Sequence, residues 1–332
     1  MSEENGINNF KSSKLIFFLL IFIFILFLVR FFIDYYFSNT DKKINVLLSP
    51  LPFSIASSLN IGDVLFYWKP KIDKVYDIGI EKPSFSADAV ISYDLTSNKL
   101  LYEKNVKERL PIASLTKIMT AIIAIENEDI KKEIVINKRA AAVGENSMGL
   151  SEGEILKLKD LLYGLVLPSG NDAAEAIAEG SRFGRDNFVY MMNKKAEDLG
   201  LTDTHFTNPS GLEGDGKQYS SVYDLLVITR YGLLKKEFAR VAATFEYVIP
   251  YSESNKAFYL RNDTNLLTSY PGVKGVKTGF TDEAGLCLVT YLEHNGHKII
   301  AVILNSQNRR EEMKELLDYS LKTLGEKPPY HP

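Results

Sequence analysis

The chain contains little cysteine and little histidine, and these shortages exclude several classes of protein. Cys287 is the single cysteine among 332 residues, so an intrachain disulfide framework and a four-cysteine zinc site are both ruled out. Four histidines leave little material for a metal centre, and we expect neither a metal nor another cofactor. No basic run exceeds a pair such as Arg309–Arg310, and the formal net charge is −3, which argues against nucleic acid as a partner.

The composition is otherwise that of an ordinary folded protein. Apolar residues make up 45% and charged residues 24%, which excludes wholesale disorder. A chain of this length can form one large domain or two small ones and bury a sizeable core. Because no repeat or low-complexity tract occurs, the function has to be sought in short motifs.

A long apolar run lies near the amino terminus. Leu15–Val29 is apolar without interruption, and the run continues to residue 33 if Arg30 reaches out to the interface. A helix of about 19 residues rises about 28 Å, close to the thickness of a bilayer core. We therefore predict a transmembrane anchor at residues 15–33. A cleaved signal peptide is the main alternative, although Asp34–Phe37 offers no small-residue cleavage site.

The orientation of this anchor depends on weaker signals. Lys11 and Lys14 before the run compete with Arg30, Lys42 and Lys43 after it. The short first segment, 1–14, and the lack of a later apolar run favour a cytoplasmic amino terminus. The prediction is a single-pass protein of the cell membrane whose main domain is extracytoplasmic.

Residues 34–85 form a membrane-proximal linker. This segment contains Pro50, Pro52, Pro70 and Pro83 and has no sustained helical period. The run Asp63–Trp68 could form a strand, which would let part of the linker pack on the domain that follows.

A globular unit is predicted from residue 86 to residue 325, with a hairpin near each end. The predicted strands are Val90–Tyr93 with Leu100–Glu103, and Leu286–Leu292 with Lys298–Leu304. Asn295–Gly296 joins the second pair and suits a tight turn with positive φ, which fixes antiparallel pairing. Cys287 lies within this hairpin and is interpreted as a small buried hydrophobe.

Helical patterns fill most of the interval between the hairpins, and a last helix precedes a short tail, 326–332. The predicted helices include Asp186–Leu199, Ser221–Leu234 and Glu311–Leu324. Strands at both ends with helices between them indicate an α/β (α+β) fold, with a central antiparallel sheet flanked by helices and an inserted helical region. A doubly wound parallel sheet would need strands to alternate regularly with helices, and they do not.

The first chemical motif is Ser114-Leu-Thr-Lys117, which opens a heavily apolar helical pattern. Ser114 and Lys117 are one turn apart, so the hydroxyl and the amine can come within hydrogen-bond reach. A serine becomes a good nucleophile when a neighbouring base takes its proton, and burial can make a lysine neutral enough to do so. A helix cap followed by a surface lysine is the alternative explanation.

The second motif is Ser169-Gly-Asn171, in the loop that enters an alanine-rich helix. Ser169 could relay a proton, and Asn171 has both a donor and an acceptor with which to hold a substrate amide. Helix capping by either side chain is the alternative.

The third motif is Lys277-Thr-Gly279, just before the second hairpin. A lysine and a threonine on a strand edge supply a cation and a hydroxyl to an anionic group, and Gly279 lets a ligand approach the backbone. A strand start with a surface lysine is the alternative.

The three motifs are far more specific together, in this order and with intervals of 55 and 108 residues between their first residues. Residues 86 to about 324 resemble the low-molecular-mass penicillin-binding proteins, serine peptidases that act as D-alanyl-D-alanine carboxypeptidases. The resemblance rests on Ala113–Thr120, Ser169–Asp172, Thr207–Leu212 and Lys277–Thr281. It implies a fold like that of the β-lactamases and DD-peptidases.

The resemblance also implies a mechanism. Ser114 would attack the carbonyl between the last two D-alanines of a peptidoglycan stem pentapeptide, and Lys117 would accept its proton. Ser169 would help to pass a proton to the departing D-alanine. Water would then release the acyl-enzyme, and β-lactams would act as covalent inhibitors at Ser114.

The remaining residues of the motifs would hold the substrate. Asn171, Lys277 and Thr278 would bind and orient it beside Gly279, and the N–H groups of Ser114 and Phe280 would form the oxyanion hole. The family also places an arginine before the last helix to bind the terminal carboxylate. Arg309 is the candidate, with Arg310 as the second choice.

The chain departs from the family pattern in two respects. Where many relatives read His-x-Ser-Thr-x-x-Asp, it has Gln218-Tyr-Ser-Ser-Val-Tyr-Asp224, to which we attach no catalytic loss. The β-rich second domain and amphipathic carboxyl-terminal anchor of many family members are not found after the last helix, and we expect the apolar run at residues 15–33 to replace that anchor.

There are three alternative functions. A class A β-lactamase would need a Glu-x-x-Leu-Asn sequence, but Ala56 and Ala301 stand where the glutamate should precede the two Leu-Asn pairs. A D,D-endopeptidase that cuts peptidoglycan crosslinks would use the same residues. A catalytically silent cell-wall scaffold on the same fold is the third alternative.

Overall fold

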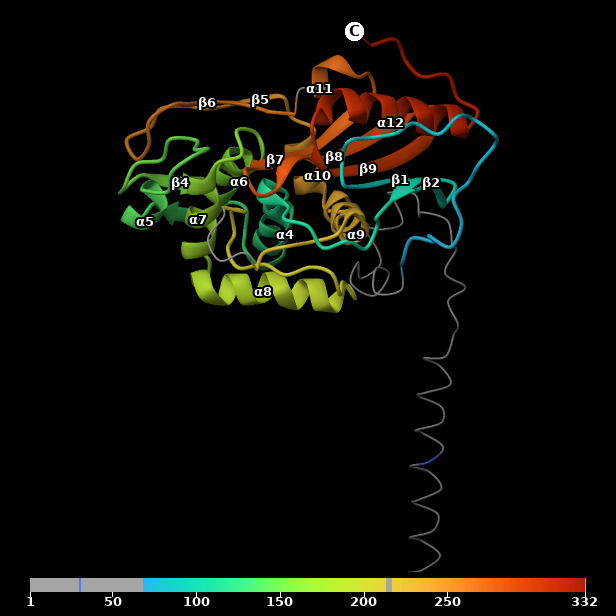
Figure 1. Cartoon of the computed structure of the whole chain (residues 1–332). Helices are drawn as coiled ribbons and strands as arrows, with labels where there is room; N and C mark the ends of the chain where they lie inside the picture. The colour runs from blue at the N-terminus through green and yellow to red at the C-terminus, as the bar shows by residue number, and fades with distance from the viewer. Residues whose placement is uncertain (1–29, 31–67, 213–216, 265, 332) are drawn as a thin grey trace, which may run out of the picture. The chain divides into compact units, whose positions relative to one another are not determined.

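The computed structural model describes residue 30 and residues 68–212, 217–264 and 266–331 (Figure 1). The contacts divide the chain into two units, Met1–Leu48 and Ser49–Pro332, and every element described below belongs to the second. Within the described ranges no helix is long and apolar enough to cross a bilayer. The anchor at residues 15–33 falls outside them, apart from Arg30, and stays a prediction.

Five strands form the central sheet, in the order β2–β1–β9–β8–β7. They are β1 (Ala89–Asp94), β2 (Lys99–Lys104), β7 (Val273–Thr281), β8 (Gly285–His294) and β9 (His297–Ser306). Every pairing is antiparallel. Both predicted hairpins are present, and Asn295 and Gly296 make the second turn with φ of 47° and 86°. The predicted fold class is therefore confirmed.

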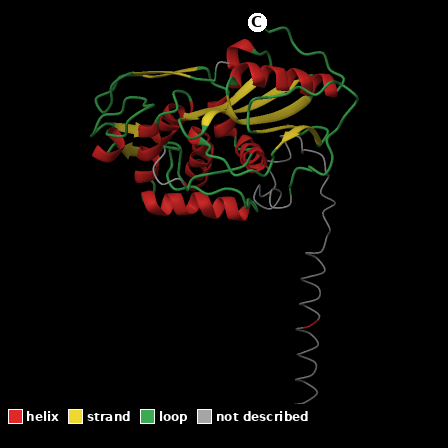
Figure 2. Cartoon of the chain, viewed as in Figure 1, coloured by secondary structure: helices red, strands yellow, loops and turns green. Residues whose placement is uncertain are grey.

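Both faces of the sheet are buried, because its side chains alternate between two hydrophobic cores. In β9, Ile300 and Val302 face the larger core, whereas Ile299 and Ile303 face the smaller one. Helix α12 (Arg309–Thr323) covers the smaller core, and helices of the inserted region cover the larger one (Figures 1 and 2). Each fully buried aliphatic side chain contributes about 1.5–3 kcal/mol to folding, so burial on both faces stabilises the sheet.

The inserted region connects β2 to β7 and is mostly helical (Figure 2). Its elements are η1 (Ala113–Thr116), α4 (Lys117–Asn127), β3 (Glu133–Val135), α5 (Lys138–Ala141), β4 (Ile155–Lys157), α6 (Leu158–Val166), α7 (Asn171–Glu179), α8 (Arg185–Asp198), α9 (Val222–Leu233), α10 (Lys236–Ala242), β5 (Glu246–Ile249), β6 (Phe258–Arg261) and α11 (Leu266–Ser269). The helices predicted from periodicity correspond to α8, α9 and α12, with ends that differ by one or two residues.

The described part of the predicted linker packs on the domain. The half-buried ring of Trp68 meets Tyr93 of β1 edge-on, with 6.1 Å between ring centroids. The Tyr76 N–H donates to the Leu100 carbonyl at 2.7 Å, and Phe85 belongs to the smaller core. Of the strand expected at Asp63–Trp68, only Trp68 is described, and it is not in a strand.

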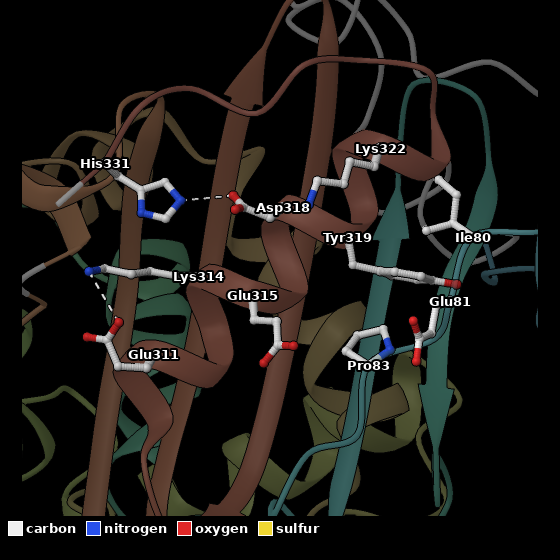
Figure 3. Close-up of a pocket in the computed structure, with 10 residues that line it drawn as sticks. All are labelled: Ile80, Glu81, Pro83, Glu311, Lys314, Glu315, Asp318, Tyr319, Lys322 and His331. Atoms are coloured by element: carbon white, nitrogen blue, oxygen red, sulfur yellow. Dashed lines mark hydrogen bonds and ion pairs between the residues drawn. The ribbon is translucent and has the colours of Figure 1, made fainter.

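A cavity of about 320 Å³ opens beside α12 (Figure 3). It lies between the 80–83 segment, α12 and the tail, where His331 Nε2 lies 3.0 Å from the Asp318 carboxylate. Charged side chains from α12 dominate its lining, and no residue of the three chemical motifs contributes to it. The first and third chemical motifs lie away from this cavity, where the edge strand β7 meets η1.

Candidate active site

Ser114 and Lys117 lie on a tight turn that brings their side chains together. The sequence pattern predicts one α-helix for both residues, but Ala113–Thr116 form the 3₁₀ turn η1, and α4 begins at Lys117. Side chains three residues apart are nearly eclipsed in a 3₁₀ turn, which suits a contact between them. Lys117 Nζ lies 2.8 Å from Ser114 Oγ. Ser114 is half-buried and Lys117 is fully buried, so the alternative of a surface lysine is wrong.

The amine of Lys117 has two further oxygen partners. One is Asn171 Oδ1 at 2.7 Å, and the other is the backbone carbonyl of Ser210 at 2.6 Å. Burial lowers the pKa of Lys117 well below its usual value, and the cation of Lys277 lowers it further. A lysine of lowered pKa can exist as the neutral amine, which is the form that accepts a proton from a hydroxyl.

The second motif faces this pair from the start of α7. Asn171 is the first residue of α7, and its Nδ2 donates to the Gly144 carbonyl at 3.1 Å, so its Oδ1 points to Lys117. Ser169 has a φ of 60°, a left-handed conformation that costs about 1–2 kcal/mol outside glycine. Its buried Oγ has no hydrogen-bond partner among the described residues. An unpartnered buried hydroxyl beside a strained backbone is a common feature of functional sites.

The third motif lies on β7, the edge strand of the sheet, as expected. Lys277 is only 1% exposed, so the alternative of a surface lysine is wrong here too. Burial lowers its pKa to about 7, the Asp263 carboxylate opposes this shift, and the Arg309 guanidinium adds to it. Thr278 is also buried. The motif therefore presents a cation whose charge changes near neutral pH.

Strand β7 packs directly against η1. A Cβ at Gly279 would lie 3.0 Å from the Ile112 carbonyl oxygen and 3.3 Å from the Ser114 nitrogen, so glycine permits this approach. The side chain of the next residue, Phe280, is 57% exposed at the end of the strand. The two backbone segments expected to form an oxyanion hole are thus neighbours.

Arg309 contacts the third motif, whereas Arg310 does not. Arg309 Nη1 donates to the Gly279 carbonyl at 2.6 Å, and burial lowers the pKa of this guanidinium. Arg310 pairs instead with Glu311, at 3.7 Å. The geometry favours Arg309 over Arg310 for contact with a substrate carboxylate.

Two residues at this site received no role from the sequence. The first is Ser210, whose contribution is a backbone carbonyl and therefore leaves no side-chain signature. The second is Asp172, a buried carboxylate that accepts from the N–H groups of Met148, Gly149 and Leu150 at 2.9–3.0 Å. Asp172 therefore holds a loop beside the start of α7, and its position after Ser169-Gly-Asn171 was the available signal.

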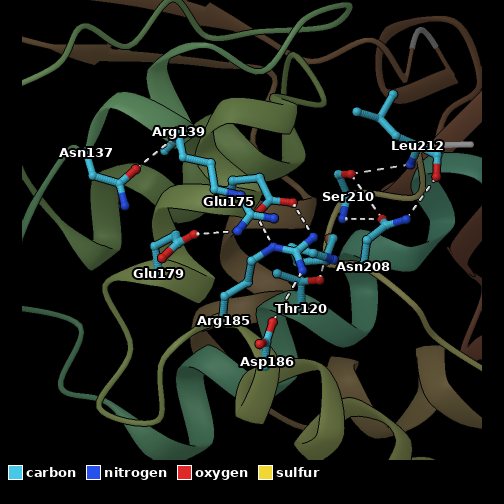
Figure 4. Close-up of polar contacts among 12 residues, drawn as sticks. Thr120, Asn137, Arg139, Glu175, Glu179, Arg185, Asp186, Asn208, Ser210 and Leu212 are labelled. Atoms are coloured by element: carbon cyan, nitrogen blue, oxygen red, sulfur yellow. Dashed lines mark hydrogen bonds and ion pairs between the residues drawn. The ribbon is translucent and has the colours of Figure 1, made fainter. Parts of the chain in front are cut away.

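The surroundings of Ser210 are shown in Figure 4. Asn208 Oδ1 accepts from the N–H and the hydroxyl of Ser210, both at 3.1 Å, and Asn208 Nδ2 donates to the Leu212 carbonyl at 2.9 Å.

An ion pair connects two helices near the site. In Figure 4 Arg185 of α8 binds Glu175 of α7 through two hydrogen bonds of 2.7 and 3.1 Å. This ion pair ties α7, which carries Asn171, to α8.

No group of three or more histidine, cysteine, aspartate or glutamate residues that could hold a metal ion occurs among the described residues. The groups that converge on Ser114 are amines, hydroxyls, amides and a carbonyl. Such a set can remove a proton from a serine and stabilise an anion through N–H groups and cations. The arrangement suits acyl transfer to a serine.

Comparison with known families agrees with this chemistry. Residues 77–308 match the model of the Peptidase S11 family, described as D-alanyl-D-alanine carboxypeptidase. This chain is a member of that family. The match spans all three motifs and all five strands of the central sheet.

Individual relatives resemble the chain over most of its length. It is 33% identical over 285 residues to the D-alanyl-D-alanine carboxypeptidase DacF of Bacillus subtilis, which covers 83% of this chain and 73% of that protein. It is 33% identical over 223 residues to DacB2 of Mycobacterium tuberculosis, covering 67% and 76%. The crystal structure of the Streptomyces K15 DD-transpeptidase is 30% identical, with a TM-score of 0.69, over 73% of this chain and 100% of that one.

Proposed function

We propose that this chain removes the terminal D-alanine from peptidoglycan stem pentapeptides through an acyl-enzyme on Ser114. The observation that carries the proposal is the 2.8 Å contact between Ser114 Oγ and the buried amine of Lys117, whose pKa burial lowers. Membership of the D-alanyl-D-alanine carboxypeptidase family supports the choice of substrate.

In the first step Lys117 takes the proton of Ser114 as the serine oxygen attacks the peptide carbonyl. The N–H groups of Ser114 and Phe280 receive the negative charge that develops on the carbonyl oxygen. The carbon–nitrogen bond to the last D-alanine then breaks, and its nitrogen takes up a proton through Lys117 and Ser169. In the second step water attacks the ester and restores the Ser114 hydroxyl.

Substrate binding is assigned to residues of α7 and β7. Asn171 would hold the peptide amide from α7, and Thr278 and Gly279 would hold the peptide along β7. The terminal carboxylate would bind near the cations of Lys277 and Arg309, because a guanidinium and a carboxylate form strong charge-assisted hydrogen bonds. A β-lactam would bind the same residues and acylate the same serine.

The test is mass spectrometry of the products formed by the full-length chain from a mixture of pentapeptide muropeptides and crosslinked dimers. We expect the pentapeptide to lose one alanine, with no reaction by Ser114→Ala and normal reaction by Ser254→Ala, an exposed serine used as the control. Splitting of dimers would instead identify an endopeptidase. No change in either substrate would favour the silent scaffold.

A penicillin adduct provides a second, independent test of the nucleophile. Intact-mass analysis should show one adduct on the wild type and on Ser254→Ala, and none on Ser114→Ala. An adduct that survives Ser114→Ala would contradict the assignment of Ser114.

Location at the cell membrane is part of the proposal and is supported by the apolar run at residues 15–33. Fractionation of cells that express the full chain should place it in the membrane fraction. External protease should cleave the domain in intact spheroplasts. Release of the protein by a salt wash would contradict the anchor.

A further inference from the structure

The carbonyl that faces Lys117 belongs to a short segment outside the three motifs. We call residues 207–212, Thr-Asn-Pro-Ser-Gly-Leu, the carbonyl loop. Its Ser210 oxygen lies 2.6 Å from Lys117 Nζ, and Ser210 is only 1% exposed. The Thr120 hydroxyl of α4 donates to the Pro209 carbonyl at 2.6 Å, which presses the loop against the helix that begins at Lys117.

The partners of Lys117 decide where its lone pair points. A neutral amine has two hydrogens and one lone pair, and the Lys117 amine has three oxygen neighbours. The oxygens of Asn171 and Ser210 are pure acceptors, because neither carries a hydrogen. They occupy both hydrogens of the neutral amine. The lone pair is left for the Ser114 hydroxyl, which donates to it.

Without the Ser210 carbonyl, one hydrogen of the amine would be free to turn toward Ser114. The amine would then donate to the serine oxygen in some of its orientations and could not accept the serine proton in those. The position of the carbonyl loop therefore affects the proton transfer itself. The loop contacts Lys117 through the Ser210 carbonyl and α4 through the Pro209 carbonyl.

Gln218 connects the carbonyl loop to the turn that carries Ser114. Its Oε1 accepts from the N–H groups of Thr207 and Asn208, at 3.0 and 3.2 Å. Its Nε2 donates to Thr116 Oγ1 at 3.2 Å, and Thr116 Oγ1 donates to the Ala113 carbonyl at 2.9 Å. Thr116 precedes Lys117 in the chain, and Ala113 precedes Ser114. The Gln218 side chain thus links the carbonyl loop to Thr116, and through Thr116 to Ala113.

We propose that Gln218 is a positioning residue that, through the carbonyl loop, directs the lone pair of Lys117 at Ser114. The inference rests on the proposed function, because it assigns Lys117 as the base and Ser114 as the nucleophile. It gives a task to the residue at which this sequence departs from the histidine of many relatives. An amide suits the task, since one side chain must accept twice and donate once.

The test compares three variants of the full-length chain by their rate of acylation with a fluorescent penicillin between pH 5 and pH 10, and by kcat and KM on a pentapeptide. Gln218→Met has a similar length but makes none of the hydrogen bonds. Gln218→Glu keeps the acceptor oxygens and loses the donor to Thr116. Asn193→Leu is the matched control. Asn193 of α8 accepts from the Phe206 N–H at 2.8 Å and donates to the Phe206 carbonyl at 2.7 Å, next to the carbonyl loop. None of its hydrogen bonds within the described ranges involves Lys117 or η1.

We expect Gln218→Met to lower kcat and the acylation rate by about 10- to 100-fold, the usual range for a small misplacement of catalytic groups, while KM changes less than about twofold. In Gln218→Glu the added negative charge raises the pKa of Lys117. The acidic limb of its rate profile should therefore move to higher pH, and part of the rate should return above the new pKa. Asn193→Leu should lower the melting temperature and leave the pH profile in place.

Three outcomes would overturn the inference: a normal rate in Gln218→Met, an equal rate loss in Asn193→Leu, or an acidic limb that does not move in Gln218→Glu. If Gln218→Met does not fold, the limb of Gln218→Glu decides. A wild type that forms no adduct at any pH would mean that the proposed function has failed, and that result is distinct from an adduct that forms equally well in all variants.

Discussion

Lys117 and Lys277 are both buried at the same site, and the charge of Lys277 lowers the pKa of Lys117. The two amines come from different elements, α4 and β7, which the fold brings together. Lys117 is tied to three oxygens, whereas Lys277 Nζ donates to the Thr278 carbonyl at 3.1 Å. Because burial lowers the pKa of both amines, Lys117 can serve as a neutral base, and Lys277 is a cation below about pH 7.

The activity should fall on the alkaline side near neutral pH. A substrate carboxylate needs the protonated form of Lys277, whose pKa burial lowers to about 7, so kcat/KM should decline as the pH rises through about 7. Lys277→Arg keeps its charge throughout this range and should move the decline above pH 9. The measurement is kcat/KM for a pentapeptide from pH 5 to pH 10, and an alkaline limb that stays in place in Lys277→Arg would assign it to another group.

The free energy of unfolding should increase as the pH rises above about 7, whereas the activity should fall. The folded chain releases the Lys277 proton at about pH 7, while the unfolded chain holds it to about pH 10.5, so unfolding takes up a proton between these values. The free energy of unfolding should then rise by about 1.4 kcal/mol per pH unit from this group. Urea unfolding at pH 7, 8 and 9 should show a smaller rise in Lys277→Met. Equal slopes in the two proteins would contradict the buried, deprotonated lysine.

Glycine at position 211 should be required for both folding and activity. Gly211 has a φ of 87°, and a Cβ there would lie 2.0 Å from the Ala113 carbonyl oxygen. Gly325 has a φ of 83° with open space around it, so Gly325→Ala isolates the backbone cost, about 1–2 kcal/mol. Gly211→Ala should cost about 1–3 kcal/mol more and slow penicillin acylation, because the clash displaces the turn that carries Ser114. Equal stability losses by urea unfolding would show that the approach is not tight.

Trp68 should stabilise the domain although it precedes the sheet. The Arg230 guanidinium lies 4.1 Å from its ring centroid, and Arg230 Nη1 has no hydrogen-bond partner among the described residues. Trp68→Ala removes this cation–π contact and the edge contact with Tyr93, so we expect a loss of about 2 kcal/mol in thermal or urea unfolding. Tyr330→Ala, at a side chain that is 91% exposed, is the control and should change stability by less than about 0.5 kcal/mol. An unchanged Trp68→Ala would mean that the contact contributes nothing.

The sheet could be predicted from the sequence because its signals are local. Asn295–Gly296 specified a turn, and the apolar strands beside it specified a buried hairpin, which placed Cys287 in the core. The pairing of β1 with β9 had no such signal, since Ala89 pairs with Leu304 across more than half of the chain. The 3₁₀ turn at Ser114 was also missed, because its residues suit an α-helix equally well.

The site was predictable only where side chains carry the chemistry. Ser114, Lys117, Asn171 and Lys277 have recognisable types at recognisable spacings, and the structure brings the first three into direct contact. Ser210 acts through a carbonyl that every residue type possesses, and it lies 93 positions from Lys117. Its role follows from the path of the backbone, which depends on packing between distant segments.

The pairing of β1 with β9 has a consequence for when the site forms during synthesis. Strand β1 has no central partner until residues near 304 have emerged, so the sheet closes only when the domain is almost complete. Contacts between such distant residues form late and slowly. Since β7 braces the turn that carries Ser114, a nascent chain would hold that serine without its reactive setting. The rate of labelling by penicillin would then report the last folding step, and a chain truncated before β9 would stay unlabelled.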